Sequence, residues 1–261
     1  MPATTEIRAL HRGLKMLELA NLHNGAQLRD FVKLTGLPKT TTYRILENLC
    51  AGGYLRRESD DDHYYLTLQV RRLSDGYYDG GWISDVARPI LRALCDALGY
   101  PVAIATPYGT SMMLRDNTDA QSTLIPDRYT RGTLLPMFSS ASGKVYLTFC
   151  DEVTRKTLLN VCATSTDPAH EMARHPHLLT RMIKKVRQQG YAFGRGESGS
   201  GAAIRTSTCA IPIFANGTLI GCLAIRYIDS HVPRQEVANK YLPTLTQHAR
   251  LIGRHVSRLA A

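Results

Sequence analysis

The chain has 261 residues, of which 44% are hydrophobic and 21% charged, with a formal net charge of +10 and a pI near 9.4. This length is enough for two domains with separate cores, and the mean hydropathy of −0.19 is that of a soluble globular protein. No stretch approaches the ~20 apolar residues of a membrane span, and no secretory signal precedes the first motif, so we expect a cytoplasmic protein without a membrane partner. The positive charge favours polyanionic partners without identifying them.

A segment near the N-terminus has the spacing of two short helices joined by a tight turn. Apolar residues within 27–34 recur close to helical spacing, and Gly36 is placed to end that helix. Pro38 can occupy the first turn of a second helix, whose apolar stripe lies within 43–50. Hydroxyl groups and cations are left near the exposed N-terminal end of this second helix: Lys39, Thr40, Thr41, Thr42 and Arg44.

Such a helix end suits the major groove of duplex DNA. A recognition helix reads base edges with its N-terminal residues, around the positive end of the helix dipole. Hydroxyl groups bond phosphate oxygens or base edges, and cations bind phosphate or guanine. A helical hairpin with a polar exposed face is the alternative that these two helices alone leave open. We expect the contacts with double-stranded operator DNA to come from Lys39, Thr40, Thr41, Thr42, Tyr43 and Arg44.

The residues that follow predict a wing. Gly52 and Gly53 stop the helix, and strand-like runs flank the turn-rich residues 58–62. Arg56 and Arg57 would lie near the DNA backbone, where phosphate contacts add salt-dependent affinity without sequence information. The acidic run in the turn does not fit a phosphate-facing tip, so we interpret it as a solvated turn directed away from DNA.

The second half predicts an αβ sandwich around a central antiparallel sheet. Strands alternate with helices from Pro101 onwards, after a turn-rich break near 75–81 and an apolar helix over 82–98 that Pro89 should kink or divide. The strand-like runs are VAIAT (102–106), SMMLRD (111–116), YAFGRG (191–196), STCAIPIF (207–214) and LIGCLAIRYI (219–228), with helices near 140–149 and 178–189.

Motifs from both halves resemble the IclR family of bacterial transcription regulators. They are LTGLPKTTTYRILENLCAGGYL within residues 7–73, then LPMFSSASGKVYLTF (135–149), QQGYAF (188–193) and CAIPIFANGTLIGCLAI (209–225). Their order covers nearly the whole chain and is more specific than any one motif. WISDVARPIL and IGCLAIRYI look closest to the subgroup that controls breakdown of aromatic acids, including regulators of hydroxyphenylpropionate catabolism.

This resemblance implies an α+β protein with a winged helix-turn-helix DNA-binding domain over 1–75, a linker and interdomain helix over 76–98, and a GAF-like effector-binding domain over 99–261. It implies a homodimer or homotetramer, because a two-fold protein matches a palindromic operator. It also implies a small aromatic carboxylate effector and an activator of a catabolic operon. A small-molecule sensor that acts through protein partners, without specific DNA binding, is the alternative reading.

One polar residue stands out in the predicted effector domain. Arg226 follows five apolar or small residues in a strand, and a buried guanidinium needs a partner, which a ligand carboxylate would supply. An internal acid or an exposed edge strand are the alternatives. Ser142 and Gly143 begin a predicted helix, whose N–H groups could also receive an anion. In the family, the matching positions that line the effector pocket are Ala141, Ser142, Thr208, Ala224 and Arg226.

Motifs that resemble catalytic or metal sites lack the context those sites require. The GxGxxG match at 194–199 is followed by a strand instead of a long helix, and we expect a mobile loop beside the pocket. SASGK (140–144) lacks most of a phosphate loop, and no nucleophile has a recognisable base. The six cysteines show no CxxC pairing, and we expect reduced, mostly buried thiols. We read the histidines at 170, 175 and 177 as a solvated helix start, and we expect no metal, no cofactor and no enzymatic activity.

Overall fold

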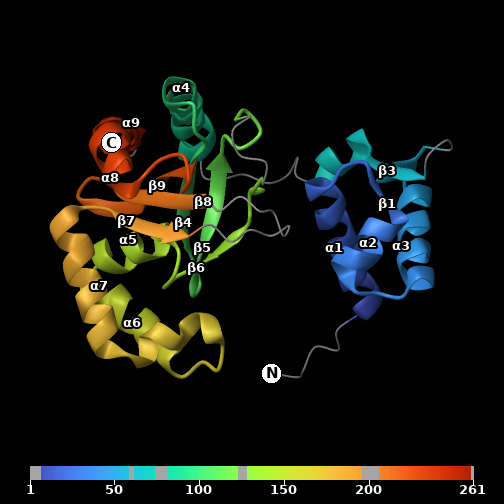
Figure 1. Cartoon of the computed structure of the whole chain (residues 1–261), viewed down its shortest axis with the longest axis horizontal. Coiled ribbons are helices and arrows are strands. Elements are labelled where there is room, and N and C mark those ends of the chain that lie inside the picture. Colours follow the sequence, from blue (N-terminus) through green and yellow to red (C-terminus); the bar gives the residue numbers. More distant parts are fainter. Residues whose placement is uncertain (1–6, 59–61, 74–80, 123–127, 196–205, 260–261) are drawn as a thin grey trace. The chain divides into compact units, whose positions relative to one another are not determined.

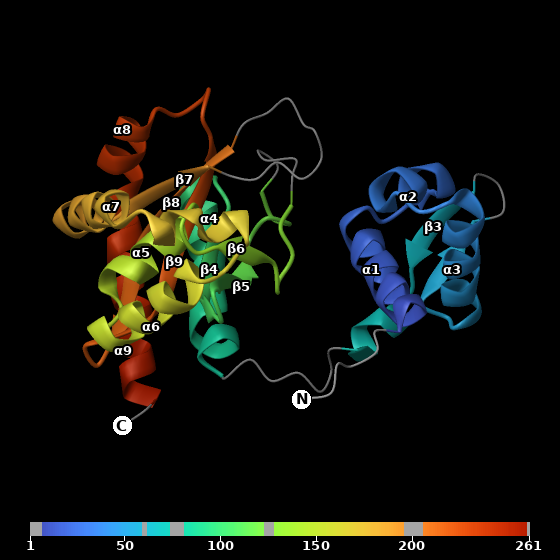
Figure 2. The same cartoon turned by 90° about the horizontal axis from the view of Figure 1, so that it is seen from below.

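The computed structural model describes residues 7–58, 62–73, 81–122, 128–195 and 206–259. The chain divides into two compact units, Met1–Tyr78 and Asp79–Ala261. Figures 1 and 2 show helices packed with a small sheet in the first unit, and a large sheet flanked by helices in the second.

The first unit is a winged helix-turn-helix. Its three-stranded antiparallel sheet has the order β1-β3-β2, and β3 is the central strand. The helices and strands are α1 (Arg8–Leu22), β1 (Ala26–Gln27), α2 (Leu28–Thr35), α3 (Lys39–Ala51), β2 (Leu55–Arg57) and β3 (His63–Leu66), followed by the 3-10 helix η1 (Leu68–Leu73).

The turn between α2 and α3 forms as the sequence indicates. Gly36 ends α2 with φ 66°, a left-handed conformation that glycine adopts without strain. Asp30 accepts a hydrogen bond from the Gln27 N–H and so caps the start of α2. Pro38 lies one residue before α3, at the N-cap, instead of within its first turn. Phe31 packs edge-on against Tyr64 at 6.2 Å between ring centroids, which joins α2 to the central strand.

The second unit contains a six-stranded antiparallel sheet in the order β6-β5-β4-β9-β8-β7. The strands are β4 (Val102–Tyr108), β5 (Ser111–Asn117), β6 (Leu134–Pro136), β7 (Ala192–Arg195), β8 (Thr206–Ala215) and β9 (Thr218–Ile228). The helices are η2 (Trp82–Ala87), α4 (Arg88–Leu98), α5 (Ala141–Phe149), α6 (Glu152–Ala163), η3 (Pro168–Arg174), α7 (Pro176–Gln189), α8 (Arg234–Glu236), η4 (Val237–Tyr241) and α9 (Leu242–Leu259).

Helices cover both faces of this sheet and form a separate apolar core on each (Figures 1 and 2). One core contains residues of η2, α4 and α9, and the other contains residues of α5 and α7. Strand residues alternate between the two cores, as for Leu223 and Ala224. The predicted α+β class and central antiparallel sheet are confirmed, and α6 and β6 are elements that the sequence pattern did not indicate.

The helix expected over 82–98 is divided, as its proline suggested. Trp82–Ala87 (η2) is a π-helical turn, and α4 begins at Arg88 with Pro89 in its first turn, where the missing N–H breaks no helical hydrogen bond.

Candidate DNA-binding surface and ligand cavity

Helix α3 exposes most of the residues predicted to contact DNA. The side chain of Tyr43 is 41% exposed, and Lys39, Thr40 and Arg44 are also exposed, whereas Thr41 is half-buried. Lys39 and Arg44 form no ion pair with another described residue, so their charges are available to a polyanion.

Thr42 does not lie on this surface. Its side chain is fully buried, and its hydroxyl donates to the Pro38 carbonyl at 3.2 Å. Helical spacing places it one turn before Leu46, which is also fully buried in the core of this unit. The expectation that Thr42 is exposed with its neighbours is therefore wrong, and Thr42 stabilises the start of α3 from within.

A surface groove between α1 and α3 extends the candidate DNA-binding surface. Thr40, Thr41 and Arg44 line it together with Arg12 of α1 and Asn48 of α3. Asn48 lies one turn after Arg44 and donates to its carbonyl oxygen at 2.7 Å. Sequence spacing could have indicated Asn48, because i and i+4 share a helix face, but no local pattern places α1 beside this face.

The wing arginines already have acidic partners. Arg56 donates to Glu58, and its guanidinium carbon lies 4.7 Å from the ring centroid of Tyr65. Arg57 pairs with Asp62 and, at 3.6 Å, with Glu47 of α3. Asp62 is therefore a partner of Arg57 and not only a solvated turn residue, while residues 59–61 lie outside the described part of the chain. These pairs reduce the positive charge that the wing presents to phosphates.

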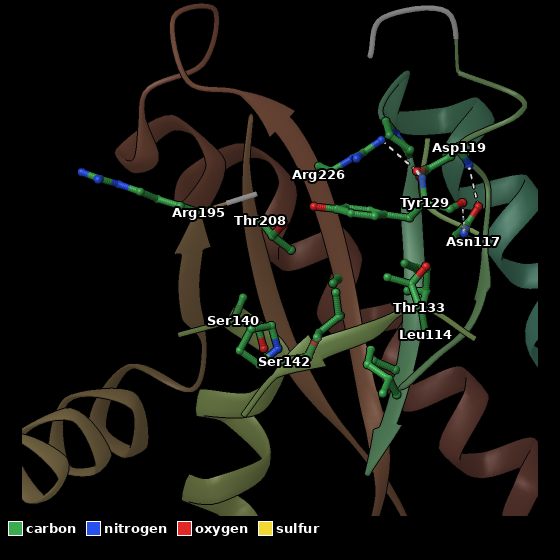
Figure 3. A pocket seen from close by; sticks show the side chains of 18 of the residues that line it. Leu114, Asn117, Asp119, Tyr129, Thr133, Ser140, Ser142, Arg195, Thr208 and Arg226 are labelled. Atoms are coloured by element: carbon green, nitrogen blue, oxygen red, sulfur yellow. Dashed lines mark hydrogen bonds and ion pairs between the residues drawn. The ribbon is translucent and has the colours of Figure 1, made fainter. Parts of the chain in front are cut away.

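The second unit holds a cavity of about 90 Å³ between the sheet and the start of α5 (Figure 3). Small side chains create it: Ala103 of β4 lies opposite Ala224 of β9 in the antiparallel register, and Ala105 continues the row along β4. A single water molecule needs about 10–15 Å³ of such space, so the cavity has room for a small organic ligand.

All five residues predicted to line an effector pocket meet around this cavity: Ala141, Ser142, Thr208, Ala224 and Arg226. The first two are at the start of α5, and the other three lie on β8 and β9, where Thr208 is opposite Arg226. The fold thus brings together residues that are up to 85 positions apart, counted from Ala141 to Arg226.

Arg226 has an acidic partner within the protein. Its side chain is 6% exposed, and Nη2 lies 2.8 Å from Oδ2 of Asp119, which is 5% exposed. Its guanidinium carbon lies 4.5 Å from the ring centroid of Tyr129. Of the alternatives open from the sequence, the internal acid is the one observed. Asp119 supplies the partner for which a ligand carboxylate was one candidate, and Arg226 also lines the cavity.

A network of hydrogen bonds holds this acidic partner in place. The Tyr129 N–H donates to Asp119 Oδ2 at 2.8 Å, and Asn117 both accepts from the Asp119 N–H and donates to the Tyr129 carbonyl. Burial raises the pKa of Asp119 above its ordinary value, and Arg226 and the Tyr129 N–H partly offset this increase. No periodic pattern in the sequence indicates these three residues, because Asn117 ends β5 and Asp119 and Tyr129 lie outside the helices and strands.

The opposite end of the cavity carries uncharged donors. Ser140 caps α5 by accepting from the Gly143 N–H at 3.0 Å, and Ser142 lies beside it at the cavity wall (Figure 3). The Ser142 hydroxyl forms no hydrogen bond with another described residue, and the same is true of the Thr208 hydroxyl, which lies next to Arg226 on the neighbouring strand. Arg195 is at the rim, and its side chain extends away from Arg226 (Figure 3).

The remaining motifs have structural roles among the described residues. Gly194 packs so closely on α5 that a Cβ would lie 2.4 Å from the Ala141 nitrogen, whereas the rest of the glycine-rich match, and the loop expected there, lies outside the described residues. Lys144 of the Gly-Lys pair donates to the Phe193 carbonyl at 3.0 Å. His170 is buried with its ring edge-on to Phe138.

The cysteines agree with the sequence-based expectation. All six are free thiols, and five of them are buried. No described helix has the length and apolar character needed to cross a bilayer, and the described residues contain no group of three side chains suited to a metal.

A winged helix-turn-helix and a second unit with an internal cavity together define a class: DNA-binding regulators that carry a separate ligand-binding domain. The family model described as IclR helix-turn-helix domain matches residues 9–59, and the model described as bacterial transcriptional regulator IclR C-terminal matches residues 77–254. The chain belongs to the IclR family of transcription regulators and is a regulator, not an enzyme.

Curated relatives agree with this assignment. The chain is 25% identical over 217 residues to the transcriptional repressor IclR of Escherichia coli, covering 77% of this chain and 73% of that one. It is 26% identical over 250 residues to the p-hydroxybenzoate hydroxylase transcriptional activator of Acinetobacter baylyi, covering 93% and 89%. A solved IclR homolog from Microbacterium hydrocarbonoxydans, complexed with 4-hydroxybenzoate, shares the fold with a TM-score of 0.58 at 19% identity, covering 94% and 98%.

The buried ion pair predicts a pH-dependent effect of Arg226→Met. Removing the guanidinium leaves the Asp119 charge buried without compensation, so we expect a loss of about 3–5 kcal/mol in the free energy of unfolding near neutral pH. The folded-state pKa of Asp119 rises further above its unfolded value of about 3.9. The folded state then binds the proton more tightly, so the deficit relative to wild type should shrink as the pH falls.

Denaturant unfolding at about pH 5 and about pH 7.5 measures this difference. Arg195→Met, at the cavity rim, is the matched control and should change stability little at either pH. Adding Asp119→Asn to Arg226→Met should recover part of the loss. A deficit that is equal at both pH values would contradict an uncompensated Asp119 charge.

Proposed function

We propose that this regulator controls an operon for breakdown of an aromatic compound, as an activator, and that a small aromatic carboxylate in the cavity changes its affinity for operator DNA. The cavity carries this proposal, since it has an apolar middle and distinct polar groups at its two ends. The names of the Acinetobacter activator and of the solved 4-hydroxybenzoate complex support an aromatic effector. An operator target also implies a cytoplasmic location.

The charges around the cavity favour one orientation of the ligand. Asp119 already neutralises Arg226, and a ligand carboxylate placed there would be repelled by the Asp119 carboxylate. The start of α5 instead offers the positive end of a helix dipole and the Ser142 hydroxyl. We therefore place the ligand carboxylate beside Ser142 and a ring hydroxyl beside Arg226 and Asp119, which together supply a donor and an acceptor.

A ligand panel tests this orientation. Hydroxylated benzoates and phenylpropionates should raise the thermal midpoint of the wild type, because a ligand that binds only the folded state stabilises it. Ser142→Ala should weaken binding of the best acid by about 1.5–3 kcal/mol, the usual contribution of a hydrogen bond to a charged group. Calorimetry measures the change in affinity.

The exposed Ser230 provides a matched control, and Ser230→Ala should leave ligand affinity unchanged. Ala224→Leu should abolish ligand binding by filling the cavity, without altering binding to DNA. Acids that bind Ala224→Leu as well as they bind wild type would show that the cavity is not their site.

For the DNA-binding unit, we propose that α3 reads the operator through Lys39, Thr40, Thr41, Tyr43 and Arg44, with Arg12 and Asn48 at its side. Arg44 is exposed near the N-terminal end of α3 and has no acidic partner among the described residues. Arg56 and Arg57 would add phosphate contacts only to the extent that their acidic partners release them.

Arg44→Ala should therefore weaken operator binding by about 1–3 kcal/mol and reduce the preference for operator over random DNA. Electrophoretic shift with the DNA adjoining the regulator's own gene, followed by footprinting, measures both effects. Lys15→Ala removes an equal charge from the same unit, where Lys15 pairs with Glu18, and should change binding little. Equal losses on operator and random DNA would contradict base reading by Arg44.

We also propose that the regulator is a homodimer, or a homotetramer built from such dimers, paired through α1. Leu10 and Leu14, 59% and 52% exposed, lie one turn apart on the same face of α1, and Ile7, 67% exposed, is at the N-cap of this helix. A second copy of this helix would bury these side chains, in the manner of a coiled coil. A dimer would also match the two-fold symmetry of a palindromic operator.

Replacing both leucines, Leu10→Ser with Leu14→Ser, should raise the dimer dissociation constant about tenfold or more, because each leucine loses apolar burial worth over ~1 kcal/mol. Light scattering or sedimentation measures the mass. Val153→Ser removes a similarly exposed apolar residue, 76% exposed on α6, and should leave the mass unchanged. An unchanged dimer in the double variant would contradict pairing through α1.

A further inference from the structure

A buried carboxylate joins helix α4 to the segment that closes the cavity. Asp116 of β5 is 1% exposed, and its Oδ2 accepts from Arg88 Nε while its Oδ1 accepts from Arg131 Nε, both at 2.7 Å. Arg88 is the first residue of α4. Arg131 belongs to residues 128–133, which we call the Tyr129 turn.

The Tyr129 turn forms one end of the cavity. Tyr129 contacts Arg226 through its ring and Asp119 through its N–H. Two residues further on, Arg131 points in the other direction, onto Asp116, which does not line the cavity. The turn is short and is hydrogen-bonded to β5 between Gly132 and the Leu114 carbonyl at 2.8 Å. The same short turn therefore holds Tyr129 at the cavity and Arg131 against Asp116.

The second carboxylate oxygen of Asp116 contacts Arg88, at the junction between η2 and α4. Arg88 lies where the π-helical turn η2 changes to the α-helix α4. π-Helical turns are rare and are found mostly at functional sites. η2 is also the first described element after residues 74–80, through which the chain passes from the DNA-binding unit to the ligand-binding unit.

The three charged groups form a contiguous network that has few stable arrangements. Asp116 is buried, so separating it from either arginine leaves a poorly compensated charge inside the protein. Coupling between distant sites is carried by contiguous networks of charged and packed groups that have two discrete arrangements. The cavity is at one end, and the helix that leads to the DNA-binding unit is at the other.

We propose that Asp116, held between Arg88 and Arg131, transmits occupancy of the cavity to η2 and α4 and so to the DNA-binding unit. The inference rests on the proposed function, in which an acid in the cavity changes operator affinity. Asp116 acts as a positioning residue, since it touches neither the cavity nor the DNA-binding unit among the described contacts. We call the contacts of Asp116 with Arg88 and Arg131 the clamp. Loss of the clamp should uncouple ligand binding from operator binding while leaving each of them intact.

Arg131→Gln is the informative variant, because the Arg131 side chain is 59% exposed and does not line the cavity. The measurement is the ratio of operator dissociation constants with and without a saturating acid, either 4-hydroxybenzoate or the panel member that stabilises the wild type most. We expect the ratio in Arg131→Gln to fall to within about twofold of one. Arg92→Gln, one turn further along α4 and without an ion pair to a described residue, should keep the wild-type ratio.

A ratio in Arg131→Gln equal to that of wild type, with both ligands still bound, would overturn the clamp. Absence of any acid effect on operator binding by the wild type is a different result, and it would refute the proposed function itself. Hydrogen exchange without ligand tests the clamp independently of that outcome. Amides of Trp82–Ala87 should exchange faster in Arg131→Gln than in Arg92→Gln, and equal protection in the two variants would also overturn the proposal.

Discussion

A guanidinium buried in a sheet must be paired, and this requirement shapes the ligand-binding unit. Arg226 lies on β9 and its partner Asp119 follows β5, so their ion pair has to cross the intervening strand β4. Ala103 of β4 is paired on one side with Ala224 of β9 and on the other with Asn117 of β5. The small side chains of Ala103 and Ala224 leave the space that forms the cavity beside this pair.

The same strand contributes to the cavity network on one face of the sheet and to the proposed Asp116 contacts on the other. Asn117 and Asp119 belong to the network around the cavity, whereas Asp116 contacts Arg88 and Arg131 on the side away from it. Because alternate residues of a strand point to opposite faces, neighbouring positions serve different sides of the sheet. A short segment of β5 is therefore in contact with both the ligand site and the helix that follows the linker.

In the DNA-binding unit, ion pairing changes where positive charge is available. Arg56 and Arg57 are paired with acids of the wing and of α3, so nonspecific attraction to phosphates is weaker there than the sequence suggests. Lys39 and Arg44, without such partners among the described residues, lie near the end of α3 that a helix-turn-helix directs into the major groove. This distribution favours sequence reading by α3 over general attraction by the wing.

Local patterns in the sequence determined most of the elements, and the family resemblance indicated residues of the cavity. Helical spacing located α2 and α3, alternation and apolar runs located β8 and β9, and the family resemblance indicated the five residues that meet at the cavity. The helical and alternating patterns depend on neighbours within a few positions, which is the range over which periodicity carries information. Only the tertiary structure decided which groups are paired: Thr42 is buried against the core, Arg57 meets Asp62, and Arg226 meets Asp119 across 107 positions. The partner of a buried charge is set by how distant strands and loops come together, and a sequence with many acids does not specify which of them arrives.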